Sequence, residues 1–323
     1  MVVVVTGAAG FIGSHICQAL IARGEQVIGI DNLNTYYNPA LKHSRLEKLV
    51  GKKNFSFVHA DISDPETFAP LQRRKDIFKI VHLAAQAGVR YSLENPRAYA
   101  RSNLIGHLEV LEFCRNLDNF EHLVYASSSS VYGGNTKVPF KETDRVDHPV
   151  SLYAATKKAD ELLSEAYAHL YGMPQTGLRF FTVYGPWGRP DMAYWLFTSA
   201  ILEDKPIRIF NYGEMWRDFT YIDDIVDGTL RVLDRRVEAE KPIARIYNIG
   251  HNKPIHLCDF ISTLEKLIGK PAIRVLEPMQ PGDVPQTFAD ITNLERDYGF
   301  TPRIDIHDGL DAFVRWYKFY FAV

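Results

Sequence analysis

Residues 2–13 read Val2-Val3-Val4-Val5-Thr6-Gly7-Ala8-Ala9-Gly10-Phe11-Ile12-Gly13. Four consecutive β-branched valines predict a strand that is buried on both faces, as in a parallel sheet. Three glycines follow at once and allow a tight turn, and an apolar-periodic helix then runs to about Ala22. The stretch therefore predicts a strand, a glycine-rich turn and a helix in direct succession.

A dinucleotide fits this arrangement, because the glycines let the backbone approach a pyrophosphate and the helix N-terminus offers unpaired N–H groups. A second strand-like run, residues 26–30, ends in Asp31-Asn32. A carboxylate about 20 residues past the glycines accepts hydrogen bonds from the adenosine ribose and repels a 2′-phosphate. A structural turn would explain the glycines but not the acid, so the pattern predicts NAD rather than NADP. The cofactor-binding residues predicted from it are Gly7, Gly10, Phe11, Ile12, Gly13, Asp31 and Asn32.

Strand-like and helical patterns alternate through the first half of the chain. Apolar runs occur at 2–5, 26–30, 55–58, 78–83, 121–126 and 175–180, and helical stretches include 97–117 and 151–171. Such alternation predicts an α/β fold, a Rossmann-type doubly wound parallel sheet with right-handed crossovers.

Beyond about residue 181 the pattern breaks into short strands with proline and glycine turns, which predicts a smaller α/β substrate-binding domain. Residues 222–250 look like a helix and strand that return to the main sheet. We therefore expect interleaved domains. Residues 1–180 plus about 222–250 would bind NAD, and about 181–221 and 251–323 would bind the substrate.

The composition limits the kind of partner. The 323 residues are 46% hydrophobic and 24% charged with a net charge of −2, so no basic excess indicates nucleic acid or an anionic membrane. The first strand begins at once and no apolar run approaches about 18 residues, so we expect a cytoplasmic protein. Three widely spaced cysteines indicate buried thiols, and eleven scattered histidines lack metal-ligand spacing.

Polar and small residues gather where the predicted strands end. In an open parallel sheet, ligands sit beyond the carboxyl ends of the strands. The residues at these ends are Gly7, Asp31, Asp61, the run 83–87, the serines 127–130 and Thr182. We expect them to face one crevice.

Tyr153 and Lys157 lie four residues apart in a helical stretch, which places a phenol and an ammonium on one helix face. A nearby cation favours phenolate, so a hydroxyl whose pKa is ordinarily about 10 can serve as a base near neutral pH. A solvated helix face would explain the pair taken alone. The predicted dinucleotide site favours the catalytic interpretation.

These motifs resemble the extended short-chain dehydrogenase/reductase superfamily, and within it the NAD-dependent nucleotide-sugar epimerases. The resemblance covers nearly the whole chain. It implies Tyr153 as the catalytic base, Ser128 at the sugar 4-hydroxyl, and Lys157 at the nicotinamide ribose. It also implies that Asp61 and Ile62 flank the adenine and that the smaller domain binds the nucleotide sugar. The further residues it implies are Leu83, Ala84, Ala85 and Ala87 at the cofactor, and Phe210, Arg217 and Asp283 at the nucleotide half of the substrate.

The two serines that follow Ser128 limit the reactions that such an enzyme could catalyse. Sugar-nucleotide dehydratases carry an Asp-Glu pair directly after the catalytic Ser or Thr, and UDP-glucuronate decarboxylases carry Glu in the second position. This chain has Ser129 and Ser130 there. No acid/base pair is available for those reactions, which leaves epimerisation: a 4-keto intermediate rotates and takes the hydride back on its other face.

The resemblance implies that Ser128, Ser129 and Ser130 address the substrate C6 together with Thr182 and Arg189. With the run from Gln86 to Arg90, which adds Arg90 as a substrate-binding residue, this pattern resembles UDP-glucuronate 4-epimerases. Hydroxyl groups can donate charge-assisted hydrogen bonds to a carboxylate, each worth roughly 1.5–3 kcal/mol. The resemblance implies 4-epimerisation of UDP-glucuronate to UDP-galacturonate in a homodimer joined through helices near 97–117 and 151–171.

Several alternatives stay open. The enzyme alternatives are a UDP-glucose or UDP-N-acetylhexosamine 4-epimerase and a UDP-glucuronate decarboxylase; the other alternative is a non-catalytic NAD-binding relative. Single residues also have ordinary structural explanations: surface arginines, a core aromatic, a helix N-cap for Asp61, a turn-forming acid for Asp283, or a hydrogen-bonded serine turn. These apply to Arg90, Arg189, Arg217, Phe210, Asp61, Asp283 and the serines 127–130.

Overall fold

The structure is a computed structural model, and it describes residues 1–235, 244–280 and 283–323. Pro281 and Gly282, which directly precede the predicted substrate-binding residue Asp283, lie outside the described residues.

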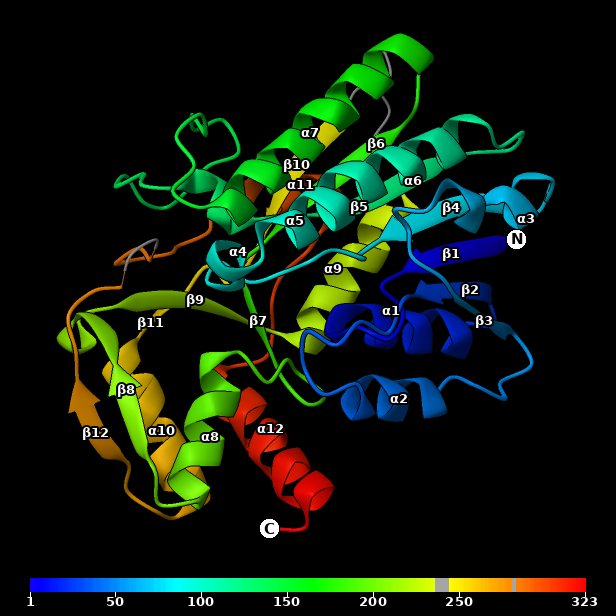
Figure 1. The fold of residues 1–323 in the computed structure, drawn as a ribbon. Helices are drawn as coiled ribbons and strands as arrows, with labels where there is room; N and C mark the ends of the chain where they lie inside the picture. Colours follow the sequence, from blue (N-terminus) through cyan, green and yellow to red (C-terminus); the bar gives the residue numbers. More distant parts are fainter. Residues whose placement is uncertain (236–243, 281–282) are drawn as a thin grey trace.

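A seven-stranded parallel sheet forms the centre of the molecule, with the order β10-β6-β5-β4-β1-β2-β3 (Figure 1). Strand β10 pairs with β6, so the segment after residue 222 returns to this sheet as the sequence predicts. The predicted doubly wound α/β fold is confirmed. Its strands are β1 Val2–Thr6, β2 Gln26–Asp31, β3 Phe55–His59, β4 Ile77–His82, β5 His122–Ser128, β6 Gln175–Phe180 and β10 Ala244–Ile249.

The valine run is buried on both faces of the sheet, because alternate side chains point to opposite sides. Val3 and Val5 pack into the core that contains helices α1 and α9, whereas Val2 and Val4 pack into the core beneath α6. Figure 1 shows α1, α2 and α9 on one face of the sheet and α5, α6 and α7 on the other. These helices are α1 Phe11–Ala22, α2 Ala40–Glu47, α5 Pro96–Tyr99, α6 Gly106–Arg115, α7 Leu152–Tyr171 and α9 Ile222–Asp234.

The helix predicted over 97–117 is not uniformly α-helical. A π-helical segment, Ala100–Ile105, separates α5 from α6. Within this segment the Asn103 side chain accepts a hydrogen bond from Gln86 N (2.8 Å) and donates to Gln86 O (3.1 Å) and Thr156 Oγ1 (2.9 Å). The widened turn thus carries an amide that ties the end of β4 to α7, and π-segments of this kind often occur beside functional sites.

The second part of the molecule is smaller and lies beyond the carboxyl ends of the main sheet (Figure 1). It contains a three-stranded sheet in the order β11-β9-β7 and a parallel pair, β12 and β8. Its strands are β7 Thr182–Tyr184, β8 Pro206–Ile209, β9 Trp216–Tyr221, β11 Pro254–His256 and β12 Ile273–Leu276. Its helices are α8 Ala193–Leu202, α10 Leu257–Ile268 and α12 Ile306–Phe321. The remaining short helices are α3 Ala69–Gln72, α4 Tyr91–Glu94 and α11 Thr292–Tyr298.

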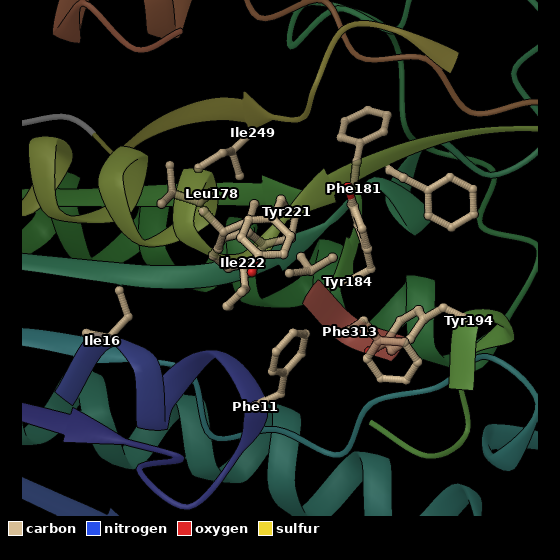
Figure 2. Packing of buried hydrophobic residues seen from close by; sticks show 14 of the residues in the cluster. Phe11, Ile16, Leu178, Phe181, Tyr184, Tyr194, Tyr221, Ile222, Ile249 and Phe313 are labelled. Carbon is tan, nitrogen blue, oxygen red and sulfur yellow. The ribbon is translucent and has the colours of Figure 1, made fainter. Parts of the chain in front are cut away.

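One aromatic core joins the two parts. Figure 2 shows Phe11 of α1 near a group that includes Tyr184, Tyr194 and Phe313, and all four belong to one buried cluster. Tyr194 meets Phe313 edge to face with ring centroids 4.8 Å apart. Because edge-to-face aromatic pairs stabilise beyond their buried area, this core fixes the smaller part beside the sheet and holds a cleft between them.

Candidate active site

The β1–α1 turn leaves no room for side chains at two of its glycines. Gly7 has φ of +73°, and a Cβ there would lie 2.8 Å from Ala84 N. A Cβ on Gly13 would lie only 2.0 Å from Gly7 O. The backbone therefore forms a close-packed cradle at the N-terminus of α1, which is the geometry that a dinucleotide pyrophosphate requires.

We expect Gly13→Ala to weaken NAD binding by about tenfold or more, a loss of roughly 1.4 kcal/mol, because the new methyl group must push α1 away from Gly7. Titration of the protein with NADH, followed by fluorescence, measures this. Gly134→Ala is the matched control, since its Cβ would meet nothing closer than 3.7 Å. Equal NADH affinity in the two variants would contradict the claim that NAD binding requires the close packing of Gly13 against Gly7.

Asp31 closes β2 and is held in place by its neighbours. Its carboxylate accepts hydrogen bonds from Ala9 N (3.1 Å) and Leu33 N (2.8 Å). Lys42 of α2 lies 3.8 Å from Asp31 Oδ1 and is almost fully buried, and burial lowers its pKa. The sequence analysis missed Lys42, because it enters the site from α2 after a long loop and no motif marks it.

Asp61 and Ile62 lie at the end of β3, beside Asp31. Asn32 Nδ2 donates to Asp61 Oδ2 (3.2 Å), and Asp61 Oδ1 accepts from Ser63 N (2.9 Å). Asp61 therefore lines the cavity and also fixes the turn that follows β3. It is not the helix N-cap that the sequence offered as an alternative, since Asp64 caps the short helix that follows.

A cavity of about 510 Å³ lies over the carboxyl ends of the strands. It brings together nearly all the predicted residues from both parts of the chain. Those lining it are Gly7, Gly10, Phe11, Ile12, Gly13, Asp31, Asn32, Asp61, Ile62, Leu83, Ala84, Ala85, Ala87, Arg90, Ser128, Ser129, Ser130, Tyr153, Lys157, Thr182, Arg189, Arg217 and Asp283. Phe210 is not among the lining residues; it lies outside the cavity, with the Arg90 guanidinium 5.1 Å from its ring centroid.

Helix α7 presents Tyr153 and Lys157 to this cavity. Its N-cap, Ser151, accepts a hydrogen bond from Ala154 N (3.1 Å), which starts the helix directly before Tyr153. The Lys157 ammonium is buried and donates to Ala126 O (2.9 Å) and Asp160 Oδ2 (3.0 Å). An ammonium has three donors, so these contacts leave one N–H available to a ligand in the cavity.

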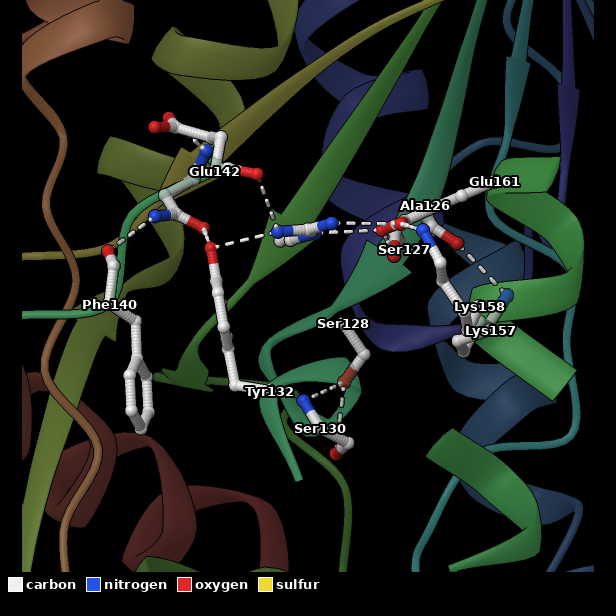
Figure 3. A network of polar contacts seen from close by, with 12 residues as sticks. Ala126, Ser127, Ser128, Ser130, Tyr132, Phe140, Glu142, Lys157, Lys158 and Glu161 are labelled. Carbon is white, nitrogen blue, oxygen red and sulfur yellow. Dashed lines mark hydrogen bonds and ion pairs between the residues drawn. The ribbon is translucent and has the colours of Figure 1, made fainter. Parts of the chain in front are cut away.

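The serines at the end of β5 and directly after it have two functions (Figure 3). Ser127 Oγ donates to Glu161 Oε1 (2.7 Å), which anchors the strand end to α7. Ser128 Oγ accepts from Ser130 N (3.2 Å) and donates to Ser130 Oγ (3.1 Å). The predicted hydrogen-bonded turn therefore exists, and it presents the hydroxyls of residues 128–130 to the cavity.

Arg189 lines the cavity with its charge already paired. Its Nε and Nη2 donate to the two carboxylate oxygens of Asp191 at 3.0 and 2.5 Å, and Tyr36 OH donates to Asp191 Oδ2 (3.0 Å). The buried Arg45 fixes this loop: it donates to Trp187 O (2.7 Å) and to Ala9 O of the glycine turn (3.1 Å). Asp191, Tyr36 and Arg45 escaped the sequence analysis, since each acts through a contact distant in sequence.

Arg217 and Asp283 both line the cavity and pair with each other, Arg217 Nη2 lying 2.8 Å from Asp283 Oδ1. Two residues predicted to bind the same half of a substrate therefore lie side by side at the mouth contributed by the smaller part. The Arg217 guanidinium also donates to Pro285 O (3.2 Å), so an anionic ligand bound there would share it with Asp283.

Among residues 1–235, 244–280 and 283–323, no helix is both long and apolar enough to cross a membrane. Within those same ranges, no cluster of three or more His, Cys, Asp or Glu side chains could hold a metal ion.

The parallel sheet, the glycine cradle and the Tyr153/Lys157 pair over one cavity define a Rossmann-type short-chain dehydrogenase/reductase. The chain belongs to the NAD dependent epimerase/dehydratase family, whose model matches residues 3–250. The predicted family is confirmed.

Similar proteins extend over almost the whole chain. The UDP-glucuronate 4-epimerase 4 of Arabidopsis thaliana is 48% identical, with 99% of this chain and 76% of the relative covered. Protein CapI of Staphylococcus aureus is 47% identical, with 99% of each chain covered. The crystal structure of a UDP-glucuronic acid 4-epimerase from Bacillus cereus in complex with UDP-glucuronic acid and NAD superposes with a TM-score of 0.91 at 36% identity, over 99% of this chain and 100% of that one.

Proposed function

We propose that this protein is an NAD-dependent 4-epimerase that interconverts UDP-glucuronate and UDP-galacturonate. The observation that carries the proposal is the wall of hydroxyls from residues 128–130 and Thr182, which shares one cavity with the Tyr153/Lys157 pair. Relatives at nearly half identity that are named UDP-glucuronate 4-epimerases support it.

NAD fits the residues present. The pyrophosphate would lie against the glycine cradle, where a Cβ at Gly13 would occupy the space next to Gly7 O. Asp31 and Asn32 would take the adenosine ribose with Lys42 behind them, and Asp61 and Ile62 would flank the adenine. The run from Leu83 to Ala87 would support the centre of the dinucleotide, and Lys157 would use its remaining N–H on the nicotinamide ribose.

In the reaction, Tyr153 removes the proton of the sugar 4-hydroxyl and later returns it. Ser128 holds that hydroxyl toward Tyr153, and the Lys157 cation stabilises the phenolate. When bound, NAD⁺ would supply the redox chemistry as the hydride acceptor and donor for C4. The cavity must also allow the 4-keto sugar to rotate so that its other face meets the cofactor, while the nucleotide stays fixed.

The site must prevent decarboxylation of the intermediate, because a 4-keto uronic acid is a β-keto acid that readily loses CO₂. Neutral hydroxyl donors at residues 128–130 and Thr182 would hold the carboxylate by charge-assisted hydrogen bonds. Asp191 already neutralises Arg189, so that cation is not free to stabilise the enolate which decarboxylation would form. Both features favour epimerisation over decarboxylation.

The nucleotide half would occupy the mouth of the cavity formed by the smaller part. Arg217 would meet the diphosphate and Asp283 a sugar hydroxyl. This assignment implies the two-domain division, with residues 1–180 and about 222–250 holding NAD and the rest holding the sugar nucleotide.

We also propose a cytoplasmic homodimer. Exposed apolar side chains lie on the two helical regions that would form the contact: Ile105 in the π-segment, and Leu162, Leu170 and Tyr171 on α7. Their exposure supports a helix-to-helix interface.

Proton NMR of UDP-glucuronate incubated with catalytic protein and no added cofactor tests the function. We expect the anomeric signal of UDP-galacturonate to grow until the two epimers reach equilibrium, because NAD is regenerated in each cycle. Formation of UDP-pentose as the main product would indicate a decarboxylase, and a higher kcat/KM for UDP-glucose would indicate a hexose epimerase.

A further inference from the structure

Asp160 of α7 is a carboxylate that the reaction described above does not use. It is 0% exposed. Its Oδ2 accepts the hydrogen bond from Lys157 Nζ at 3.0 Å, whereas Oδ1 is buried without a hydrogen-bond partner among the described residues. A buried carboxylate with one unsatisfied oxygen is costly, so its presence beneath the active-site lysine calls for an explanation.

The groups packed around Asp160 leave Lys157 as its counter-ion. Glu161, on the same helix, is a like charge, and it is engaged by Arg179 of β6 through two hydrogen bonds (2.8 and 2.9 Å). From α6, His107 is neutral at physiological pH, since burial lowers its pKa to about 3. Tyr125 of β5 is likewise uncharged, because burial raises its pKa. His82 of β4 faces Lys157, and burial keeps its pKa well below the usual range.

Two opposing effects, burial and the charge of Lys157, therefore determine the pKa of Asp160. Burial raises the pKa of its carboxyl to about 6, against the opposing attraction of Lys157. The carboxylate is ionised at neutral pH and becomes protonated in mildly acidic solution.

Residues 153, 157 and 160 lie at helical spacings of four and three, on one side of α7. The Lys157 ammonium thus stands between a phenol that lines the cavity and a carboxylate that is sealed from it. The negative charge of Asp160 opposes the positive charge of Lys157, so Tyr153 experiences the sum of the two charges.

We propose that Asp160 is a positioning residue that sets the proton affinity of Tyr153, by holding Lys157 in place and offsetting part of its charge. The inference rests on the proposed function in that Tyr153 is taken as the base. An ionised Asp160 makes the lysine a weaker stabiliser of phenolate, so Tyr153 gives up its proton less readily and recovers it more readily. An epimerase benefits from this balance, because the same group must both take and return the proton in every cycle.

The sign of the effect is fixed by the charges. Asp160→Asn removes the negative charge but keeps an acceptor for Lys157, so the uncompensated ammonium favours phenolate. We expect the midpoint of Tyr153 ionisation, and the acidic limb of kcat against pH, to fall by about one pH unit.

Ultraviolet difference spectroscopy reads this ionisation without any substrate. The tyrosinate absorbance of NAD-loaded protein is titrated from pH 5 to about 9, and the titration of Tyr153→Phe, or of Asp160→Asn with Tyr153→Phe, is subtracted. The control is Glu165→Gln, which removes an exposed carboxylate from the same helix and should leave the midpoint unchanged. Asp160→Leu, which has nearly the same shape and no polar atoms, should give the same shift if Asp160→Asn folds poorly.

Lys157→Met separates a charge effect from a general disturbance. In that background the buried Asp160 carboxyl has lost its counter-ion, so desolvation keeps it protonated. Adding Asp160→Asn then exchanges one neutral group for another and should no longer lower the midpoint. Superposition of the Asp160→Asn and wild-type titrations would overturn the inference, and so would an equal shift in the Lys157→Met background. A failed epimerase assay would leave these spectra intact, so the two proposals fail separately.

Discussion

Tyr153→Phe is expected to lower kcat for epimerisation by roughly 10²- to 10⁴-fold, the usual contribution of a positioned proton-transfer group. The phenyl ring keeps the edge-to-face contact with Tyr99, whose ring centroid lies 6.0 Å away, so the cavity should keep its shape. KM for UDP-glucuronate should change little, because the lost hydroxyl acts on the proton rather than on the nucleotide. Initial rates at several substrate concentrations measure both constants.

Tyr171→Phe is the matched control for this change. It removes a phenol from the far end of the same helix, where the side chain is 46% exposed and outside the cavity. Its kcat should equal that of the wild type. Loss of a general base usually lowers kcat by at least about 100-fold. If Tyr153→Phe retained more than about a tenth of the wild-type kcat, the loss would be too small, and Tyr153 would not be the base.

Glu161→Leu is expected to destabilise the protein by roughly 3–5 kcal/mol, because it leaves the Arg179 guanidinium buried without its partner. Both side chains are 3% exposed, and Ser127 Oγ also loses its acceptor. Figure 3 shows how this network continues from Glu161 toward Tyr132 and Glu142. Urea unfolding at pH 7 measures the loss.

The double variant Glu161→Leu/Arg179→Met sharpens this prediction. Replacing a whole buried ion pair with apolar groups is often nearly neutral, so the double variant should be more stable than Glu161→Leu alone. A loss equal to the sum of the two single losses would contradict a coupled pair. Asp311→Ala is the surface control: its partner Arg315 is 74% exposed, and the expected loss is at most about 1 kcal/mol.

The effect of Glu161 should also depend on pH. Burial alone would raise the pKa of its carboxyl, but the hydrogen bonds and charge of Arg179 outweigh burial and hold it below the ordinary value of 4.5. A depressed carboxyl pKa stabilises the folded state above the unfolded value, and that contribution is lost as pH falls through the folded value. The stability difference between wild type and Glu161→Leu should therefore be full at pH 7 and shrink below about pH 4.5.

Strand positions were predicted well where local sequence dictates them. The valine run is buried on both faces, and a residue pattern that permits this fits little else. The helical stretch predicted over 97–117 is confirmed, but its π-segment was not anticipated, because Asn103 in that segment contacts Gln86 and Thr156, which are distant in sequence. The periodicity of apolar residues does not reveal the extra residue of a π-helical turn when a tertiary contact stabilises that turn.

Site residues divide in the same way. Tyr153, Lys157 and the glycines were found because their spacing within a single element already fixes their geometry. Lys42, Asp191 and Asp160 were missed, since each derives its importance from a partner that only folding, or the burial that comes with it, supplies. Phe210 carried a plausible aromatic signal, yet the chain places it outside the cavity lining.

The amino-acid sequence alone determined the parallel sheet, the glycine cradle and the direction in which the strand ends point, because these follow from short-range sterics and the two-residue repeat of a strand. The charge states of the side chains around the cavity were decided only by the tertiary structure. Whether an arginine is free or paired, or a carboxylate solvated or sealed beneath a lysine, depends on burial and on partners far along the chain. Electrostatic energies change severalfold with the local dielectric constant, and a sequence pattern does not specify the dielectric environment of a side chain.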